Sequence, residues 1–281
     1  MGRGVSSGPT PLPPLESVAG LVCDLDGVVY RGRLAVTHAV ESLGSLTVPI
    51  VYATNNAGRR PQAVAKHLRE LGLEVAVEQV VTSAQAGAAA IAAAMPGARV
   101  LAVGGEGVAA ALDEAGLEPA TSAAGAVAVM QGYGPQVSMS DLAEAAYAVR
   151  DGAWWVATNL DLTIPNERGI APGNGALVAA VQHAVGRAPD RVCGKPHPDL
   201  YILAARRLGV HVHRTVAVGD RLDTDIEGAN AAGAASILVL TGVHSRDDVA
   251  RAPEHQQPSV VIEDLRGLSG LVPMSIPPTL G

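Results

Sequence analysis

The stretch Leu21-Val22-Cys23-Asp24-Leu25-Asp26-Gly27-Val28-Val29-Tyr30 decides how the rest of the chain is interpreted. Its apolar first part is typical of a buried strand, and that strand ends in two acids separated by one residue. Residues i and i+2 of a strand point to the same side, and Gly27 allows a sharp turn. We therefore expect Asp24 and Asp26 to leave the carboxyl end of a buried strand together, where open parallel sheets bind their ligands.

This pair of acids predicts a metal site. Two carboxylates so close repel each other, and a divalent cation relieves that repulsion. Mg²⁺ prefers oxygen ligands and often uses only one or two carboxylates. The alternative is a pair of solvated acids in a surface turn, and the rest of the chain favours the metal.

Composition limits the class of protein. Of the 281 residues, 48% are hydrophobic but only 2% are aromatic and Phe is absent, so Ala, Val, Leu and Ile must fill the core. The net charge of −7 argues against nucleic acid as a partner. The two cysteines, Cys23 and Cys193, have no metal-ligand spacing and are expected to be reduced thiols in the cytoplasm. A membrane span needs about 18 consecutive apolar residues, and no apolar run in this sequence is close to that length. The start of the chain also lacks a signal-peptide pattern.

Strands alternate with helices along the chain, which predicts an α/β fold with mostly parallel sheets. After the first strand, a βα unit is expected over 80–94, and further strands are expected at 50–53, 99–104, 126–131, 154–158, 215–219 and 235–240. Helices are expected at 36–46, 61–72, 107–116, 140–151, 174–186, 198–208 and 225–233.

The polar strand ends predict the domain organisation. They fall within residues 18–82 and 190–265, while the middle of the chain, 83–189, supplies no comparable acid cluster. We therefore expect a Rossmann-like parallel-sheet core, formed by 18–82 and 190–265, with 83–189 inserted as a second α/β domain. Residues 1–17 and 266–281 are rich in Pro and Gly and are expected to form an arm and a peripheral tail.

Taken as one site, the strand ends suit phosphoryl chemistry. A carboxylate such as Asp24 can attack phosphorus and form an aspartyl-phosphate. Asp26 can protonate the leaving oxygen and later deprotonate the attacking water. Lys195 can neutralise phosphate charge, and Asp220 can hold Mg²⁺ together with Asp24 and a backbone carbonyl.

Each part also has a plain alternative. Thr54-Asn55-Asn56 is an ordinary turn by itself, and Lys195-Pro196 is a surface loop. The acids from Asp220 to Asp225 can instead favour the N-terminus of a helix. Four such features at strand ends, in this order, favour one shared site.

These residues resemble the haloacid dehalogenase superfamily of phosphotransferases. Asp24-Leu25-Asp26-Gly27-Val28 is similar to its first motif, Thr54-Asn55 to its second, Lys195-Pro196 to its third, and Gly219-Asp220-Arg221-Leu222-Asp223-Thr224-Asp225 to its fourth. The subfamily with the most similar motifs contains phosphoglycolate, nucleotide-monophosphate, pyridoxal-phosphate and glycerol-3-phosphate phosphatases. That subfamily carries a large α/β cap between its second and third motifs, where the insertion falls here.

The resemblance implies a role for each motif residue. Asp24 is expected to be the nucleophile and Asp26 the general acid and base. Mg²⁺ is expected on Asp24, the carbonyl of Asp26 and Asp220, with Asp225 supporting these ligands without touching the ion. Phosphate is expected to bind to Thr54, Asn55, Asn56 and Lys195.

The inserted cap is expected to select the substrate. Two cap stretches resemble the subfamily's loops that face the active site, and their candidate contacts are Asn159, Asp161, Arg168 and Asn174. Plain loops and a helix N-cap are the alternatives. Ile164 stands where animal phosphoglycolate phosphatases carry a histidine. The cap is most similar to that of actinobacterial glycerol-3-phosphate phosphatases.

The predicted function is therefore Mg²⁺-dependent hydrolysis of a small cytoplasmic phosphomonoester, with glycerol 3-phosphate the first candidate. Phosphoglycolate, nucleotide monophosphates and pyridoxal phosphate are alternative substrates, and a phosphotransferase or mutase is a close alternative reaction. An alternative from a different class of protein is a non-catalytic phosphate-binding module. Relatives often dimerise through the cap, so a homodimer is a further expectation.

Two cap features have a second interpretation. Val103-Gly104-Gly105-Glu106-Gly107-Val108-Ala109 matches a dinucleotide fingerprint, but the next strand ends in Met130-Gln131 rather than in the required acid. A tight turn is therefore expected there. Trp154 and Trp155 are expected to pack in the cap or at a dimer interface.

Overall fold

The computed structural model describes residues 9–166 and 168–274. Its internal contacts divide the chain into two compact units, each built from separate segments. The first unit comprises Met1–Ala53, Ala65–Val80 and Pro196–Gly281, and the second comprises Thr54–Val64 and Val81–Lys195. The predicted α/β fold is confirmed, and each unit contains a sheet with parallel strands.

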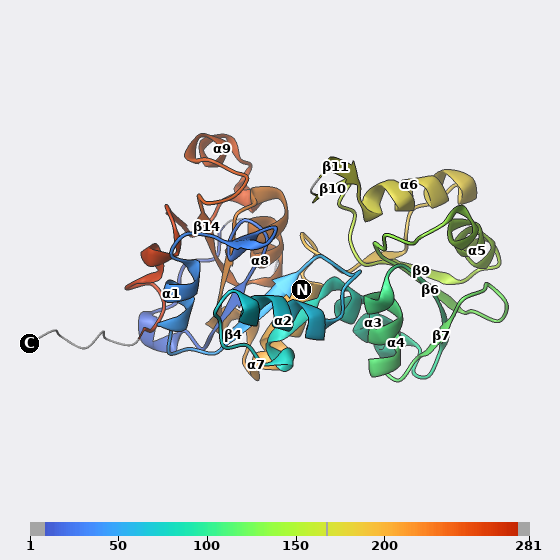
Figure 1. Cartoon of the computed structure of the whole chain (residues 1–281), viewed down its shortest axis with the longest axis horizontal. Coiled ribbons are helices and arrows are strands. Elements are labelled where there is room, and N and C mark those ends of the chain that lie inside the picture. The colour runs from blue at the N-terminus through green and yellow to red at the C-terminus, as the bar shows by residue number, and fades with distance from the viewer. Residues whose placement is uncertain (1–8, 167, 275–281) are drawn as a thin grey trace, which may run out of the picture. The chain divides into compact units, whose positions relative to one another are not determined.

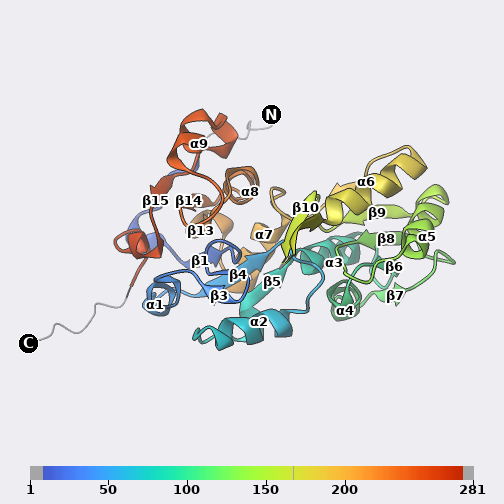
Figure 2. The same ribbon diagram turned by 45° about the horizontal axis from the view of Figure 1, so that its top comes forward.

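The six-stranded sheet has β1 (Gly20–Cys23) near its middle, and all four β1 residues are buried. The strand order is β15-β14-β13-β1-β4-β5, which can be followed across Figure 2. The other strands are β4 (Ile50–Thr54), β5 (Val80–Thr82), β13 (Thr215–Gly219), β14 (Ala235–Val239) and β15 (Val260–Ile262). β1 pairs in parallel with β4 and with β13, so that Cys23 lies opposite Tyr52 on one side and Val218 on the other.

This strand order creates a switch point between β1 and β13. From β1 the chain adds β4 and β5 on one side, then returns to add β13, β14 and β15 on the other. In open α/β sheets, ligands bind outside the carboxyl ends of the strands at such a point. Asp24 and Asp220 directly follow the two strands that flank it.

The first unit also contains helices α1 (Ala39–Gly44), α7 (Asp199–Leu208), α8 (Glu227–Ala232) and α9 (Arg246–Arg251) (Figure 1). Helix α2 (Pro61–Glu70) begins in a segment of the second unit and ends in one of the first, and a hairpin is formed by β2 (Tyr30–Arg31) and β3 (Leu34–Ala35). A π-helix, Leu222–Ile226, precedes α8. Short 3-10 turns lie at Leu15–Ser17, Val77–Gln79, Val212–Arg214, Glu254–Gln256 and Leu265–Leu268.

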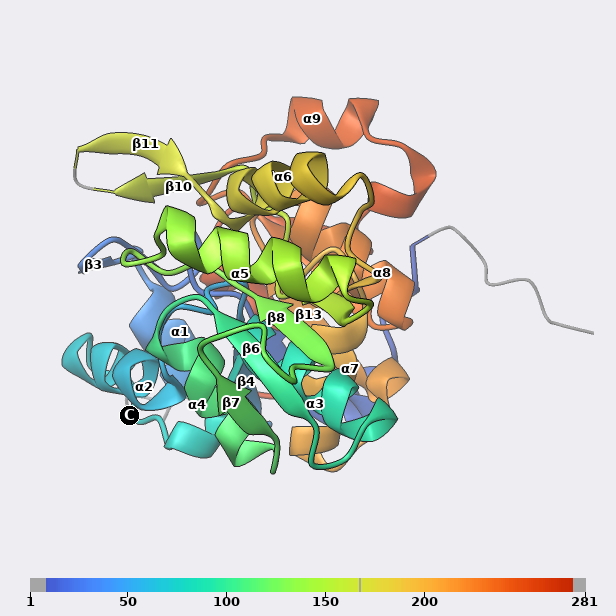
Figure 3. The same cartoon turned by 90° about the vertical axis from the view of Figure 1, so that its right-hand side faces the viewer.

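The second unit contains a five-stranded parallel sheet in the order β12-β9-β8-β6-β7. Its strands are β6 (Arg99–Val103), β7 (Glu118–Ala120), β8 (Ala128–Gln131), β9 (Trp154–Ala157) and β12 (Arg191–Val192). Helices α5 (Met139–Arg150) and α6 (Asn174–Val185) cover one face, and α3 (Ser83–Ala94) and α4 (Glu106–Glu114) cover the other (Figures 1 and 3). A separate hairpin is formed by β10 (Thr163–Asn166) and β11 (Gly169–Pro172).

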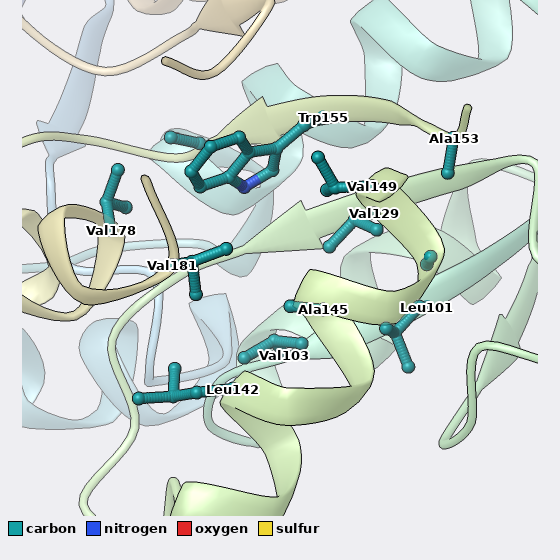
Figure 4. Packing of buried hydrophobic residues seen from close by; sticks show 12 residues of the cluster. Leu101, Val103, Val129, Leu142, Ala145, Val149, Ala153, Trp155, Val178 and Val181 are labelled. Carbon is teal, nitrogen blue, oxygen red and sulfur yellow. The ribbon is translucent and has the colours of Figure 1, made fainter. Parts of the chain in front are cut away.

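Trp155 packs inside this second unit, and internal packing was one of the two expectations for the tryptophans. Its side chain is fully buried among residues of α5, α6 and the sheet, including Val129, Val149 and Val181 (Figure 4). The indole N–H donates a hydrogen bond to Oε1 of Gln131 at 3.1 Å, so the polar atom of the ring is satisfied in the core.

Several elements differ from the expectations. The helix expected over 36–46 is shorter because His38 adopts a left-handed conformation, and α1 begins after it. Part of the expected arm and tail, residues 1–8 and 275–281, lies outside the described residues. In the described part of the tail, Leu268 and Val272 are buried, so this part packs into the core instead of lying at the periphery.

Among the helices of the described ranges, none combines the length and the apolar character needed to span a bilayer.

Candidate active site

Three carboxylates gather at the switch point of the core sheet. Asp24, Asp220 and Asp225 each offer an oxygen, and these oxygens all lie within 4.8 Å of one another. Asp24 follows β1, Asp220 follows β13, and Asp225 lies in the π-helix between β13 and α8. π-Helical turns are rare, and those that occur are frequently found at functional sites.

The side chains of these three acids are buried or partly buried. Asp220 and Asp225 are each 2% exposed, and Asp24 is partly buried. Oδ2 of Asp220 accepts the backbone N–H of Val243 at 2.8 Å, and Oδ2 of Asp225 accepts that of Arg221 at 3.1 Å. Because buried like charges destabilise one another unless they are compensated, this donor set suits a hard divalent cation.

The segment Thr241–His244, which follows β14, closes around Asp220. The N–H of His244 donates to the Asp220 carbonyl at 3.2 Å, in addition to the bond from Val243. A Cβ on Gly242 would overlap the Asp220 carboxylate, so only glycine fits there. Residue types gave no sign that this segment holds Asp220, because it does so through backbone N–H groups and the missing side chain of Gly242.

Gly27 fixes the turn after the two motif acids. Its φ of +82° is a conformation that favours glycine, and a Cβ would lie 2.5 Å from Oδ2 of Asp220. Its N–H donates to the carbonyl of Tyr30 at 2.8 Å, and its own carbonyl accepts the Thr241 hydroxyl at 2.8 Å. Both peptide groups of Gly27 are therefore held, and with them the carbonyl of Asp26.

Asp26 differs from Asp24 in its environment. Leu25 between them is fully buried, Asp24 is partly buried, and Asp26 is exposed. The third carboxylate of the cluster is Asp225 and not Asp26. The Asp26 side chain thus remains at the surface of the core, where a proton donor or acceptor can reach solvent.

The acids of the fourth motif have different hydrogen-bond partners. Asp223 takes two hydrogen bonds from the Arg221 guanidinium, Nε to Oδ1 at 3.1 Å and a terminal nitrogen to Oδ2 at 2.8 Å. Burial raises the pKa of Asp223, but these bonds and the charge of Arg221 outweigh it, so the pKa lies below its ordinary value. Asp223 is therefore paired with Arg221, while Asp225 joins the cluster.

A second group of predicted residues meets in the second unit. Nδ2 of Asn55 donates to the Lys195 carbonyl at 3.0 Å and to Oδ2 of Asp161 at 3.2 Å. Oδ1 of Asn55 accepts the Lys195 N–H at 2.8 Å. Lys195 is only 5% exposed. Residues far apart in the sequence are thus joined by one side-chain amide.

Asn159 and Asn174 lie behind this group. They are 3% and 1% exposed. Nδ2 of Asn159 donates to the Asn55 carbonyl at 2.7 Å, and Nδ2 of Asn174 donates to the Asn159 carbonyl at 2.8 Å. These bonds to backbone carbonyls favour support of the loop over direct contact with a ligand. Ser83, fully buried and not predicted, also donates to the Asn55 carbonyl, at 2.7 Å.

The other predicted residues lie in turns. Thr54 ends β4 and is 4% exposed, and its hydroxyl oxygen accepts the N–H of Asn56 at 3.1 Å. Oδ1 of Asn56 accepts the N–H of Gly58 at 3.0 Å. Arg168 is exposed in the turn of the β10–β11 hairpin, directly after residue 167, which lies outside the described residues.

Other backbone segments of the same unit pack directly against the glycine-rich turn after β6. A Cβ on Gly105 would lie 2.6 Å from the carbonyl oxygen of Gly58, and one on Gly107 would overlap the Ala57 carbonyl. A Cβ on Gly134 would overlap the backbone of Gly105. These glycines therefore allow backbone segments to pack together, which accounts for the turn without a dinucleotide.

Comparison with known proteins agrees with these motifs. A model described as haloacid dehalogenase-like hydrolase matches residues 21–118, and a related hydrolase-like model matches 192–268. D-glycerol 3-phosphate phosphatase of Mycobacterium tuberculosis is 48% identical over 250 residues, covering 88% of this chain and 70% of that protein. Acid sugar phosphatase of Staphylococcus aureus is 38% identical over 238 residues, covering 84% and 91%.

Solved structures give the same result. The crystal structure of glycerol phosphate phosphatase from M. tuberculosis in complex with magnesium has a TM-score of 0.86 and 47% identity, covering 90% of this chain and 77% of that one. A p-nitrophenyl phosphatase from Archaeoglobus fulgidus has a TM-score of 0.84 and 30% identity, covering 92% and 100%. The chain belongs to the haloacid dehalogenase-like hydrolases.

Proposed function

We propose that this chain is a Mg²⁺-dependent phosphatase that hydrolyses a small phosphomonoester through an aspartyl-phosphate on Asp24. The observation that carries the proposal is the carboxylate cluster of Asp24, Asp220 and Asp225 at the switch point of the core sheet. Phosphatases 48% and 38% identical to this chain support the same reaction class.

The residues present fit a magnesium ion. The cluster offers several hard oxygen donors, and the 2% exposure of Asp220 and Asp225 makes an uncompensated negative charge unfavourable. Asp24, Asp220 and the carbonyl of Asp26 would hold the ion, with Asp225 beside them. When bound, Mg²⁺ neutralises negative charge that would otherwise repel an anionic substrate.

The chain's own residues supply the chemistry. A carboxylate oxygen of Asp24 forms a bond to phosphorus while the bond to the alcohol oxygen breaks. Asp26 gives its proton to that leaving oxygen, then takes a proton from the water that attacks the aspartyl-phosphate and releases inorganic phosphate. Thr54, the backbone near Asn55 and Asn56, and Lys195 bind phosphoryl oxygens.

Glycerol 3-phosphate is the substrate we propose, because the 48% identical relative is named for it. The acid sugar phosphatase relative makes sugar phosphates the second candidate. Residues 83–189 would act as the cap that selects the substrate, with Asp161 and Arg168 as contacts, and the protein would work in the cytoplasm. Dimerisation through this cap is part of the same proposal.

A substrate panel with Mg²⁺ tests the function. It should contain glycerol 3-phosphate, phosphoglycolate, a sugar phosphate, a nucleotide monophosphate and pyridoxal phosphate, with inorganic phosphate as the readout. Asp24→Asn should abolish turnover with an unchanged circular dichroism spectrum, and exposed Asp113→Asn is the matched control. Unchanged turnover in Asp24→Asn would exclude Asp24 as nucleophile, and binding of phosphate without any turnover in the wild type would indicate a non-catalytic module.

A further inference from the structure

Both polar atoms of the Asn55 side-chain amide have hydrogen-bond partners within their own unit. Its two N–H groups donate to the Lys195 carbonyl at 3.0 Å and to Oδ2 of Asp161 at 3.2 Å. Its oxygen accepts the Lys195 N–H at 2.8 Å. An amide has two N–H donors and one carbonyl acceptor, so both donors already have protein partners. The pair of bonds to Lys195 resembles the bonding between two backbone segments.

The surroundings hold this amide in place. The Asn55 carbonyl accepts the Ser83 hydroxyl and Nδ2 of Asn159, each at 2.7 Å. A Cβ on Gly194 would lie 2.7 Å from Oδ1 of Asn55 and would overlap the Thr158 carbonyl. Glycine before the lysine is therefore needed for the close approach of the two segments.

Asp161 extends the arrangement to the loop between β9 and β10. Its backbone N–H donates to Oδ1 of Asn159 at 3.1 Å, while its carboxylate takes the Asn55 amide. Asn159 is in turn held by Asn174, which is 1% exposed. The Asn55 side chain thus links the loop 159–161 to the backbone of Lys195.

We propose that Asn55 is a positioning residue, which fixes the backbone of Lys195 and ties it to the loop 159–161 through Asp161. This inference rests on the proposed function, in which Lys195 binds the phosphoryl group. It assigns Asn55 a task other than direct phosphate contact by its side chain. A change at Asp161 then alters phosphate binding through Asn55 and Lys195.

The lysine content of the chain allows a test that needs no activity. Lys66 and Lys195 are its two lysines, so ¹⁵N-lysine labelling gives two backbone amide signals, assigned by a Lys66→Arg variant. Asn55→Ala should move the Lys195 amide signal and raise its hydrogen-exchange rate at least tenfold, while Lys66 stays unchanged. An unchanged Lys195 signal and exchange rate would overturn the proposal.

The kinetic measurement distinguishes positioning from a loss of folded protein. In Asn55→Ala, KM for glycerol 3-phosphate and the inhibition constant of inorganic phosphate should each rise about tenfold, which corresponds to about 1.4 kcal/mol. The Mg²⁺ concentration for half-maximal activity should not change. If the wild type hydrolyses no phosphomonoester, the proposed function fails, and the lysine signals still decide the role of Asn55.

Asn230→Ala is the matched control. Asn230 is 8% exposed and its amide also makes three hydrogen bonds, to the carbonyls of His255 and Gln257 and from the hydroxyl of Ser236. We expect a loss of thermal stability in this variant without a change in the Lys195 signal or the phosphate inhibition constant. Equal changes in Asn230→Ala and Asn55→Ala would refute the positioning role.

Substitutions at Asp161 test the link to the loop. Asp161→Ala removes an acceptor of the Asn55 amide and should shift the Lys195 signal part of the way seen in Asn55→Ala. Asp161→Asn keeps a carbonyl acceptor and should restore the wild-type signal. An unchanged Lys195 signal in Asp161→Ala would show that the loop does not affect the position of the lysine. This variant also gives an answer if Asn55→Ala does not fold.

Discussion

The backbone N–H of Val243 donates a hydrogen bond of 2.8 Å to Oδ2 of Asp220. The two residues come from the loops after neighbouring parallel strands, β14 and β13. This bond leaves no room for a side chain at Gly242, where a Cβ would overlap the same carboxylate. The Asp220 carboxylate is therefore held in place by the backbone around it.

Gly242→Ala should displace Asp220 and weaken Mg²⁺ binding. We expect the Mg²⁺ concentration for half-maximal activity to rise at least tenfold and the folded state to lose about 1–3 kcal/mol from overpacking. Thermal unfolding with and without Mg²⁺ measures both effects. Gly44→Ala is the control, because nothing lies within 4 Å of a Cβ at that position. An unaltered Mg²⁺ response in Gly242→Ala would mean that Asp220 does not bind the ion.

Asp26→Asn should affect substrates according to their leaving groups. The side chain is exposed and lies outside the carboxylate cluster, as expected for a residue that exchanges protons with substrate and solvent. Alkyl phosphates need a proton on the leaving oxygen, so their kcat should fall by about 10²–10⁴-fold. Activated aryl phosphates should lose much less in the first step. Equal losses for glycerol 3-phosphate and p-nitrophenyl phosphate, measured under single-turnover conditions, would remove the acid role from Asp26.

Ca²⁺ should inhibit the Mg²⁺-dependent reaction. Ca²⁺ takes 6–8 oxygen ligands at about 2.3–2.6 Å, whereas Mg²⁺ requires octahedral geometry at about 2.0–2.1 Å. A compact cluster whose oxygens lie within 4.8 Å can hold either ion, but the larger one loosens the position of the Asp24 carboxylate. Initial rates at fixed Mg²⁺ and rising Ca²⁺ measure the effect. Full activity with Ca²⁺ alone would contradict the proposed metal site.

The pair of Asp264 and Arg266 should stabilise the fold only above strongly acidic pH. Hydrogen bonds from the Arg266 side chain hold the pKa of Asp264 at about 2, below its unfolded value of about 3.9. The stabilisation is therefore complete above about pH 4 and is lost as pH falls towards 2. In urea unfolding, Asp264→Asn should lower the free energy of unfolding at pH 6 by less than about 1 kcal/mol.

At pH 2 that difference should nearly vanish. Arg266→Gln should reproduce it at pH 6, and the double variant should add little to either single change. Additive losses at pH 6 would show that the two side chains stabilise the fold independently.

The sequence was sufficient to predict features that depend on strand ends. Buried apolar runs ending in Asp24 and Asp220 predicted two strands whose ends share one site, and the structure pairs these strands directly. The alternation of strands and helices predicted the fold class for the same reason. Residue spacing alone did not distinguish Asp223 from Asp225, which only the resemblance placed beside the metal, because the π-helix directs Asp225 to the cluster while Asp223 pairs with Arg221.

Other features could not be predicted from the sequence, and the reasons are physical. The hairpin strands β10 and β11 contain Pro165 and Pro172, which a two-stranded edge tolerates but which argue against a strand in sequence. Backbone donors such as the Val243 N–H leave no trace in residue types. The bonds from Asn55 to Lys195 join positions 140 residues apart, and one sequence contains no signal for such a pairing.

The glycine-rich turn after β6 has a consequence for any attempt to isolate the second unit. Residues 57–59 fill the space beside Gly105 and Gly107, although they precede β5 and are separated in sequence from the five-stranded sheet. An excised fragment beginning at Val81 would expose the backbone around Gly105 and Gly107 to water and leave these glycines without the segment that packs against them. A self-sufficient version of this unit would have to carry the 54–64 segment with it, joined by a new connection to the start of α3.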